Sequence, residues 1–294
     1  MTSFSAFAKT RIVPILAFVF AAILLTMSAC EEIPPTLNIN GESTGPVSNE
    51  LNDQLSGVLV EEFTGVKCVN CPAGAEAIAL LKGTHKERLV PISLHAGFFS
   101  SPYPESTIDF RTAAADAVET FIGGPQGYPS SVIDRKQFQG ESSLQLSQNS
   151  WAGYIDLQLQ ADPAVAIGVE LAYEESDRGL TVDVELLGRT GTDGRNASIT
   201  VLLLENKVIN VQLTPEGKDL DYSHEHVLRS AITSPTGEPL GAIAAGASME
   251  EAYTFTVPSD INTDNVEIVV FVHYADADAG GKEILQAVSK KLGE

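Results

Sequence analysis

A pair of cysteines two residues apart constrains this chain more than any other feature. Cys68-Val69-Asn70-Cys71-Pro72 follows an apolar run at 58–63 and precedes an alanine-rich segment at 73–81. This order predicts a strand, a short turn and a helix that begins at the cysteines. A helix N-terminus carries partial positive charge and free N–H groups, which stabilise a thiolate. Because the thiolate is the reactive form, this placement favours disulfide exchange.

Two other positions complete a resemblance to the thioredoxin fold. Thioredoxin-like proteins carry a Cys-x-x-Cys beside a βα unit, a cis-proline that faces the dithiol, and a buried acid six residues ahead of the first cysteine. Pro129 and Glu62 stand at the corresponding places here. The resemblance implies that Pro129 shapes a groove for the substrate chain and that Glu62, with a raised pKa, takes the proton of the resolving thiol.

Each of these two residues also has a plainer interpretation. Pro129 is then an ordinary loop proline, and Glu62 a surface glutamate beside Glu61. Alternation along a strand lets only one of the two glutamates face the site. The six-residue spacing favours Glu62.

The place of each cysteine at the helix start predicts its chemistry. Cys68 is nearer the free N–H groups and follows Lys67, so we expect it to be the more exposed thiol, with the lower pKa, and to attack first. Cys71 should face the body of the domain near Glu62 and act as the resolving thiol. Lys67 stands where thioredoxins have tryptophan, and Val69-Asn70 replaces their Gly-Pro, so the redox direction stays open.

The apolar periodicity changes near residue 162. Residues 55–161 contain a further apolar strand at 89–95 and a helical pattern at 105–121, which with the cysteine unit predict an α/β thioredoxin-like domain. Residues 162–294 contain several alternating segments, which predict strands with one buried face and suggest an all-β immunoglobulin-like sandwich domain. Each half has enough apolar residues for its own core, so we expect the second half to fold alone.

Residues 1–29 have the layout of an export signal. Lys9 and Arg11 precede an apolar run that is short for a membrane span, and small residues then lead to Cys30. This order resembles the lipobox of bacterial lipoproteins, which implies a signal peptide, a diacylglycerol thioether on Cys30 and an acylated amine carrying a chain such as palmitate. Several acyl chains would anchor the protein to a membrane firmly. The alternative is an ordinary secretory signal with an unmodified Cys30.

The charge of the chain limits its partners. The formal net charge is -21, and it becomes -23 without residues 1–29. Such acidity argues against nucleic acid and anionic lipid headgroups as partners. Residues 30–54 are rich in Pro, Gly and Asn and predict a flexible tether. Glu31 and Glu32 resemble sorting signals that place some lipoproteins on the cell surface, so the periplasmic and the cell-surface faces both stay open.

Two further polar clusters give weaker signals. His224 and His226 would share one face of a strand, a spacing that can chelate copper or zinc. They lack an evident third ligand, so a hydrogen-bonded pair at a domain interface is favoured. Asp276 and Asp278 lie in an expected hairpin loop without the remaining ligands of a calcium site. We therefore expect no metal and no cofactor.

Over nearly all of the mature chain the sequence resembles thioredoxin-like outer-membrane lipoproteins, the twenty-eight-kilodalton outer-membrane protein family. The resemblance rests on Glu61-Glu62-Phe63-Thr64-Gly65 leading into the cysteines, on Gly127-Tyr128-Pro129-Ser130, and on residues 222–229. It implies a lipid-anchored protein of the outer membrane.

Two classes of function follow. The first is a thiol–disulfide oxidoreductase acting on envelope or extracellular proteins, with a mixed disulfide formed on Cys68 and released by Cys71. The second is a surface binding or adhesion module, in which Cys68–Cys71 is a static disulfide and the β segment carries the partner site. Fold alone does not choose between them. The paired cysteines at a helix start favour the first.

Overall fold

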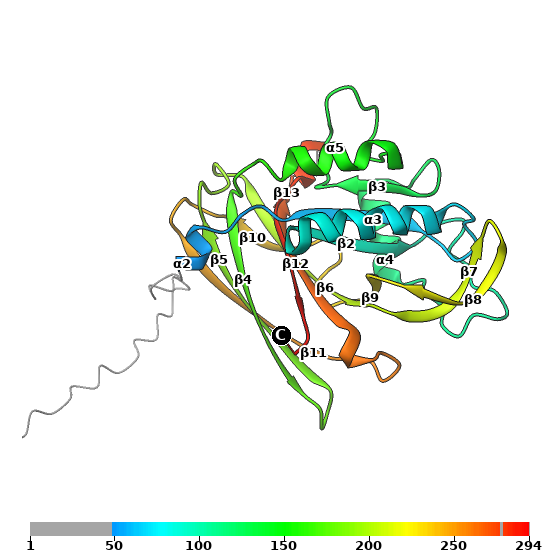
Figure 1. The fold of residues 1–294 in the computed structure, drawn as a ribbon. Coiled ribbons are helices and arrows are strands. Elements are labelled where there is room, and N and C mark those ends of the chain that lie inside the picture. Colours follow the sequence, from blue (N-terminus) through cyan, green and yellow to red (C-terminus); the bar gives the residue numbers. More distant parts are fainter. Residues whose placement is uncertain (1–48, 277–278, 294) are drawn as a thin grey trace, which may run out of the picture. The chain divides into compact units, whose positions relative to one another are not determined.

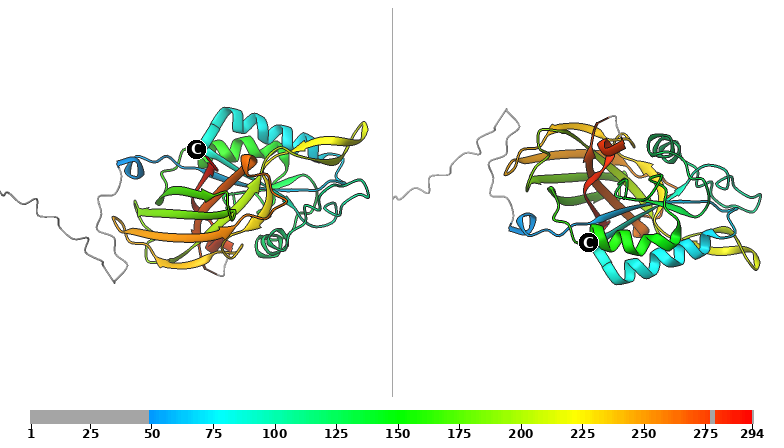
Figure 2. Two further views of the ribbon diagram at one scale, coloured as in Figure 1. Left: turned by 90° about the horizontal axis from the view of Figure 1, so that it is seen from below. Right: turned by 90° about the horizontal axis from the view of Figure 1, so that it is seen from above.

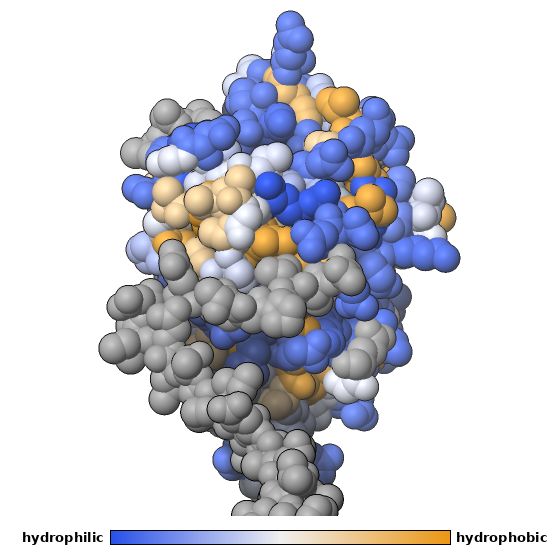
Figure 3. Space-filling model, turned by 90° about the vertical axis from the view of Figure 1, so that its left-hand side faces the viewer, coloured by the Kyte–Doolittle hydropathy of each residue, from blue (hydrophilic) through white to orange (hydrophobic). Residues whose placement is uncertain are grey.

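The computed structural model describes residues 49–276 and 279–293. The expected signal peptide, Cys30 and most of the expected tether lie outside these residues. Within the described part of the chain, no helix is both long enough and apolar enough to cross a membrane. The face shown in Figure 3 is mainly hydrophilic, with scattered apolar groups, as expected for so acidic a chain.

The folded body begins earlier in the chain than the sequence suggested. The short helix α2 (Asn49–Asn52) places Leu51 in a buried apolar cluster. Gln54 donates a hydrogen bond to the carbonyl of Ile167 at 2.8 Å and accepts one from its N–H at 2.9 Å. Residues 49–54 were expected to belong to the tether, but these contacts make them part of the fold.

One eight-stranded sheet joins strands from both halves of the chain (Figure 1). Its strand order is β13 (Ile284–Lys291), β12 (Val266–Tyr274), β6 (Asn196–Glu205), β9 (Val227–Ala231), β2 (Leu89–His95), β1 (Val58–Thr64) and β3 (Ser130–Ile133), and β10 (Glu238–Ala242) pairs with β6 outside this order. β1 and β2 are parallel, β3 is antiparallel to β1, and β9 connects β2 to β6 and the strands beyond it.

Helices cover both faces of the part of this sheet that contains β1, β2 and β3. α3 (Cys71–His85) and α5 (Gln148–Gln158) pack on one face, and α4 (Ala113–Ile122) packs on the other (Figure 2). Alternation along β1 explains the division, because Val60 joins the α3–α5 cluster and Phe63 joins the α4 cluster. A short 3-10 helix, η1 (Lys86–Arg88), links α3 to β2. The predicted strands at 58–63 and 89–95 and the helix that starts at the cysteines are confirmed.

The C-terminal region is rich in β structure. β4 (Val165–Glu174), β5 (Gly179–Gly188) and β11 (Ser248–Thr256) form a three-stranded antiparallel sheet. A buried cluster packs this sheet against β6 and β12, with alternate residues of each strand turned inward. β7 (Val208–Thr214) and β8 (Gly217–His224) form a separate hairpin, and 3-10 turns η2 (Thr263–Asn265) and η3 (Ala279–Lys282) flank β12.

The boundary expected near residue 162 does not interrupt the core. Leu59 and Phe63 of β1 share one buried cluster with Leu204 of β6 and Phe271 of β12. Glu61 of β1 forms a fully buried ion pair with Arg135, whose guanidinium lies 5.0 Å from the ring of Phe271. The two halves therefore share hydrogen bonds, apolar packing and a buried charge. Hydrophobic periodicity alone could not predict that the two halves share one core.

The helix predicted at 105–121 is shorter than expected. α4 begins only at Ala113, where the side chain of Thr112 accepts a hydrogen bond from the N–H of Ala115 at 3.0 Å. The residues before it are held by β7: the side chain of Asn210 accepts from the N–H of Thr107 at 3.0 Å and donates to the carbonyl of residue 108 at 2.8 Å. These long-range bonds satisfy backbone groups that a helix would otherwise pair.

Candidate functional site

The two cysteines lie where the sequence placed them, at the start of α3. Cys68 and Cys71 form a disulfide, and Cys71 is the first residue of the helix. Pro72 follows in the first turn, where the missing N–H of proline costs nothing. The N–H of Cys71 donates to the carbonyl of Cys68 at 3.3 Å, which closes the turn between them.

Both cysteines are buried, which corrects the expectation that Cys68 is the more exposed. Cys68 is 3% exposed and Cys71 2%. The β7–β8 hairpin lies against the backbone of Cys68, since Nε2 of Gln212 donates to the carbonyl of Cys68 at 2.9 Å. The N–H of Leu213 also donates to the carbonyl of Val66 at 2.8 Å. No local sequence pattern could predict these contacts, because Gln212 and Leu213 lie far along the chain from Cys68.

Lys67 is also held in place. Its backbone N–H donates to the carbonyl of Phe99 at 3.1 Å, and its ammonium donates to Oγ of Ser101 at 2.8 Å. The ammonium lies 5.3 Å from the centre of the Tyr103 ring. The positive charge next to Cys68 is therefore fixed by the loop after β2 and is not a freely solvated lysine.

Glu62, and not Glu61, lies on the α3 side of the sheet. Glu61 points to the opposite face, where Arg135 binds both of its carboxylate oxygens at 2.9 and 2.6 Å. Glu62 is 2% exposed, and its Oε1 has no hydrogen-bond partner among the described residues. Burial raises the pKa of Glu62 from 4.5 to about 8. Its carboxyl is therefore mainly protonated at neutral pH.

Pro129 and Glu62 meet at the first turn of α3. The Tyr128–Pro129 peptide bond is cis, as predicted. Gly74 lacks a side chain at the point of contact, where a Cβ would lie 2.8 Å from Oε1 of Glu62 and 2.9 Å from Cβ of Pro129. Such distances leave no room for a methyl group, so Gly74 allows this close packing. The helix that carries Cys71 thus brings the predicted acid and the predicted proline together.

A cavity of about 440 Å³ lies beside Cys71, between α3 and the end of β8. One stripe of α3 faces it, made of Cys71, Ala75, Ile78, Ala79 and Lys82, whose spacing places them on one side of a helix. The sheet and the hairpin supply the other walls, which include Glu62, Thr64, Ser93, His95, Gln212, Tyr222 and His224. Cys68 is not among the lining residues.

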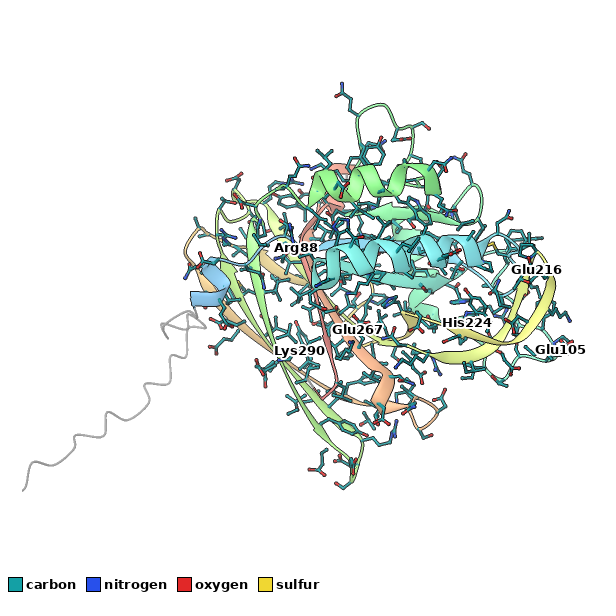
Figure 4. The ribbon with its side chains drawn as sticks, in the orientation of Figure 1. Arg88, Glu105, Glu216, His224, Glu267 and Lys290 are labelled. Atoms are coloured by element: carbon teal, nitrogen blue, oxygen red, sulfur yellow. A yellow bond between two sulfur atoms is a disulfide. The ribbon has the colours of Figure 1, made fainter. Side chains whose placement is uncertain are left out.

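Two buried histidines contribute unpartnered nitrogens to this site. Both ring nitrogens of His95 and Nε2 of His224 lack hydrogen-bond partners among the described residues. Their ring centres are 5.6 Å apart, and His224 lies below α3 near the base of the hairpin (Figure 4). Burial lowers the pKa of His224 to about 4 and that of His95 well below its usual range. Both imidazoles are therefore neutral at pH 7.

His95 was not identified as a site residue from the sequence. It ends β2 directly beside Thr64 at the end of the parallel strand β1. The carboxyl ends of parallel strands are where α/β folds most often place functional groups. The position of His95 at the end of a predicted strand was the sequence feature that could have identified it.

His224 and His226 do not share a strand face, which corrects that expectation. β8 ends at His224, and His226 adopts a left-handed backbone with φ of 54°. Nδ1 of His226 lies 3.1 Å from Oε2 of Glu267, and His226 lines the same cavity as His95 and His224. Among the described residues, no group of three or more side chains is arranged to hold a metal ion.

The family comparison agrees with the sequence resemblance. The family described as outer membrane protein Omp28 matches residues 116–294. This is more than half of the chain, so the chain belongs to that family. The matched segment begins after the cysteines and includes Pro129 and His224. No curated protein matches the chain.

Solved structures of low sequence identity resemble this chain to different degrees. HBP35 of Porphyromonas gingivalis superposes with a TM-score of 0.64 and 19% identity, covering 82% of this chain and 76% of that one. Protein AGR_C_4864 of Agrobacterium tumefaciens gives a TM-score of 0.51 and 16% identity, covering 82% of this chain and 96% of that one. A domain of the outer membrane lipoprotein Omp28 from Porphyromonas gingivalis overlaps less, with a TM-score of 0.30, 19% identity and coverage of 44% and 88%. The first two establish a shared mixed α/β and β-rich fold.

Proposed function

We propose that this chain is a lipid-anchored outer-membrane protein whose Cys68–Cys71 pair exchanges disulfides with other proteins of the envelope or cell surface. The observation that carries the proposal is the meeting of three groups at one helix turn. The disulfide starts α3, and Glu62 and Pro129 both contact that turn at Gly74. A buried carboxyl without a partner costs stability, and such groups cluster at functional sites.

The roles of the residues follow from their chemistry. In the reduced protein the thiolate of Cys68 attacks a client disulfide, forms a mixed disulfide and releases one client thiolate. The thiol of Cys71 then loses its proton and attacks Cys68, which releases the second client thiolate and restores the intramolecular disulfide. Glu62 accepts the proton of Cys71 in the minor fraction of molecules in which its carboxyl is ionised, because a base with a pKa of about 8 is well matched to a thiol near neutral pH. Pro129 borders the groove in which the client chain lies.

The same proposal assigns the domains and the anchor. Residues 55–161 are thioredoxin-like, an interpretation supported by the parallel β1–β2 pair, the antiparallel β3 and helices on both faces. Residues 162–294 are immunoglobulin-like, an interpretation supported by two sheets packed around one apolar cluster. Cys30 carries the lipid. Membership of an outer-membrane family supports that location, with the protein on the periplasmic or the cell-surface face.

A second candidate is a surface binding module in which the disulfide is static. The burial of both cysteines favours it, because a client chain can react with a sulfur so little exposed only after a local rearrangement. Under this alternative the β-rich region binds the partner. Neither Glu62 nor Pro129 then has a chemical role.

Single-cysteine variants test the choice. In the envelope of cells producing the mature protein, Cys71→Ser should trap mixed disulfides with other proteins, because the resolving thiol is absent. Cys68→Ser is the matched control and should trap few or none. Complexes are read on non-reducing gels and identified by mass spectrometry after reduction. Absence of trapped proteins with both variants favours the binding module.

A further inference from the structure

The disulfide can be approached from the side of Cys71. Cys71 belongs to the stripe of α3 that faces the cavity of about 440 Å³, and Cys68 does not line it. On the side of Cys68, the hairpin donates hydrogen bonds to the carbonyls of Cys68 and Val66. A molecule small enough to enter the cavity therefore meets the buried Cys71 in its wall.

The cavity is equipped to bind a sulfur anion. Oε1 of Glu62, both ring nitrogens of His95 and Nε2 of His224 are buried and without partners among the described residues. A neutral imidazole carries one N–H, and a protonated carboxyl carries one O–H, so these groups can donate hydrogen bonds. Buried polar groups of native proteins nearly always have a partner. Three such residues around one cavity indicate a bound molecule or ordered water.

The entrance is unfavourable for molecules with additional negative charge. Glu76, Glu225 and Lys82 line the cavity. The ammonium of Lys82 donates to the carbonyl of Leu89 at 2.8 Å. The chain as a whole carries a formal net charge of -21. Such a field lowers the local concentration of anions and raises that of cations.

We propose that this cavity binds low-molecular-weight thiols with a neutral or positively charged body, and that such a thiol exchanges with the disulfide at Cys71. The proposal rests on the exchange function proposed above and adds a second substrate class to it. Envelope proteins react at Cys68, and small aminothiols reduce the pair, or small disulfides oxidise it, at Cys71. The two substrate classes thus use opposite sulfurs.

The exchange step needs no further reagent. The thiolate of the small molecule forms a bond to the sulfur of Cys71, the bond between Cys71 and Cys68 breaks, and Cys68 leaves as a thiolate. The negative charge moves from the incoming sulfur to Cys68, where the helix N-terminus and Lys67 stabilise it. A thiol of lower pKa leaves faster, so attack at Cys71 is the chemically favoured direction. A second thiol then releases the small molecule as its own disulfide.

The attacked sulfur can be identified directly. The oxidised mature protein is mixed briefly with cysteamine, quenched with acid, alkylated and mapped by peptide mass spectrometry. The expected product carries cysteamine on Cys71 and the alkyl group on Cys68. The opposite assignment overturns the proposal.

Reduction rates test the cavity and its charge. Cysteamine and 3-mercaptopropionate have similar size and opposite charge. The rate at which each thiol reduces the protein disulfide is expressed per thiolate and divided by the rate at which it reduces the disulfide of an oxidised peptide of residues 66–73. We expect cysteamine to be favoured roughly tenfold at low ionic strength, with the preference lost in about 1 M salt. Replacing Glu76 and Glu225 together by Gln should reduce it, whereas Glu250→Gln, on the distant strand β11, should not. Equal normalised rates for the two thiols overturn the charge argument.

A filled cavity provides the last test. Ala75→Leu replaces a methyl group of the cavity wall by an isobutyl group, and Ala73→Leu makes the same change at an exposed position of the same helix that does not line the cavity. Ala75→Leu should slow reduction by cysteamine about tenfold or more, since small displacements of reacting atoms are costly, and Ala73→Leu should not. Equal rates for the two variants overturn the proposal. If Cys71→Ser traps envelope proteins but cysteamine is found on Cys68, the proposal for the cavity is wrong and the exchange function stands. If cysteamine is found on Cys68 and no envelope protein is trapped, both proposals are wrong.

Discussion

Replacing Glu62 by Gln should stabilise the protein in a strongly pH-dependent way. Burial raises the pKa of this carboxyl from 4.5 to about 8. Below pH 4.5 the group is neutral in both the folded and the unfolded state and contributes nothing. Between pH 4.5 and 8 only the unfolded chain ionises, so the folded state loses stability as the pH rises, and above pH 8 the loss is constant.

The size of the effect follows from that difference in pKa. One pKa unit corresponds to about 1.36 kcal/mol. Relative to a protein with a neutral side chain at this position, the free energy of unfolding of the wild type should be lower by about 1 kcal/mol at pH 5, about 3 kcal/mol at pH 7 and ~5 kcal/mol above pH 8. Any water in the cavity reduces these figures, which are upper values. The amide of Gln adds an offset of its own that does not change with pH. The test therefore lies in the slope of the stability difference.

Urea unfolding of the oxidised protein between pH 5 and pH 9 measures this slope. Glu61→Gln is the matched control, because Glu61 is the neighbouring residue on the opposite face and pairs with Arg135. Leaving the charge of Arg135 buried without a partner should destabilise the fold by about 3–5 kcal/mol. A Glu62→Gln advantage that is flat from pH 5 to pH 9 would refute the assignment of Glu62 as a buried, protonated acid.

Three further outcomes are expected. Residues 162–294 expressed alone should fail to unfold cooperatively, as followed by circular dichroism during thermal melting, because Leu204 and Phe271 lose their partners Leu59 and Phe63; a sharp transition would show that the second half forms its own core. Gln212→Ala should speed alkylation of Cys68 in the reduced protein, since it removes the 2.9 Å bond to the carbonyl of Cys68, whereas Gln160→Ala should not; equal rates would mean that the hairpin does not limit access. Cys30→Ser should release the protein from membranes or block its processing, measured by fractionation and by mass spectrometry of the N-terminal peptide; unchanged partitioning without acyl chains would reject lipidation.

Local patterns predicted the parts of the site that depend on nearby residues. The cysteine spacing and the apolar runs located β1, α3 and β2, and the order of the chain located Pro129 and Glu62. Alternation along a strand separated Glu62 from Glu61, and the structure places them on opposite faces as that rule requires. Except for Pro129, which the resemblance to thioredoxin located by its order in the chain, each of these features is encoded by a short stretch of neighbouring residues.

Contacts between distant segments could not be predicted in the same way. Gln212 bonds to the carbonyl of Cys68, and Asn210 binds the residues before α4 so that the helix begins later than expected. Both residues belong to a hairpin that lies more than a hundred residues further along the chain. His95 and His224 come from β2 and β8 and meet only in the folded protein. The continuity of the sheet depends on β9, whose pairing with β2 involves a single residue pair, Ser93 and Val227. Periodicity carries no information about such pairings.

The reduction potential of the Cys68–Cys71 pair tests the central claim most directly. Equilibration of the mature protein with dithiothreitol or glutathione buffers, followed by alkylation and mass measurement, gives the value. An exchange centre should lie between about -270 and -120 mV, the range of known thiol–disulfide oxidoreductases. A potential below about -300 mV, typical of structural disulfides, would contradict the account and leave the pair as a static bond.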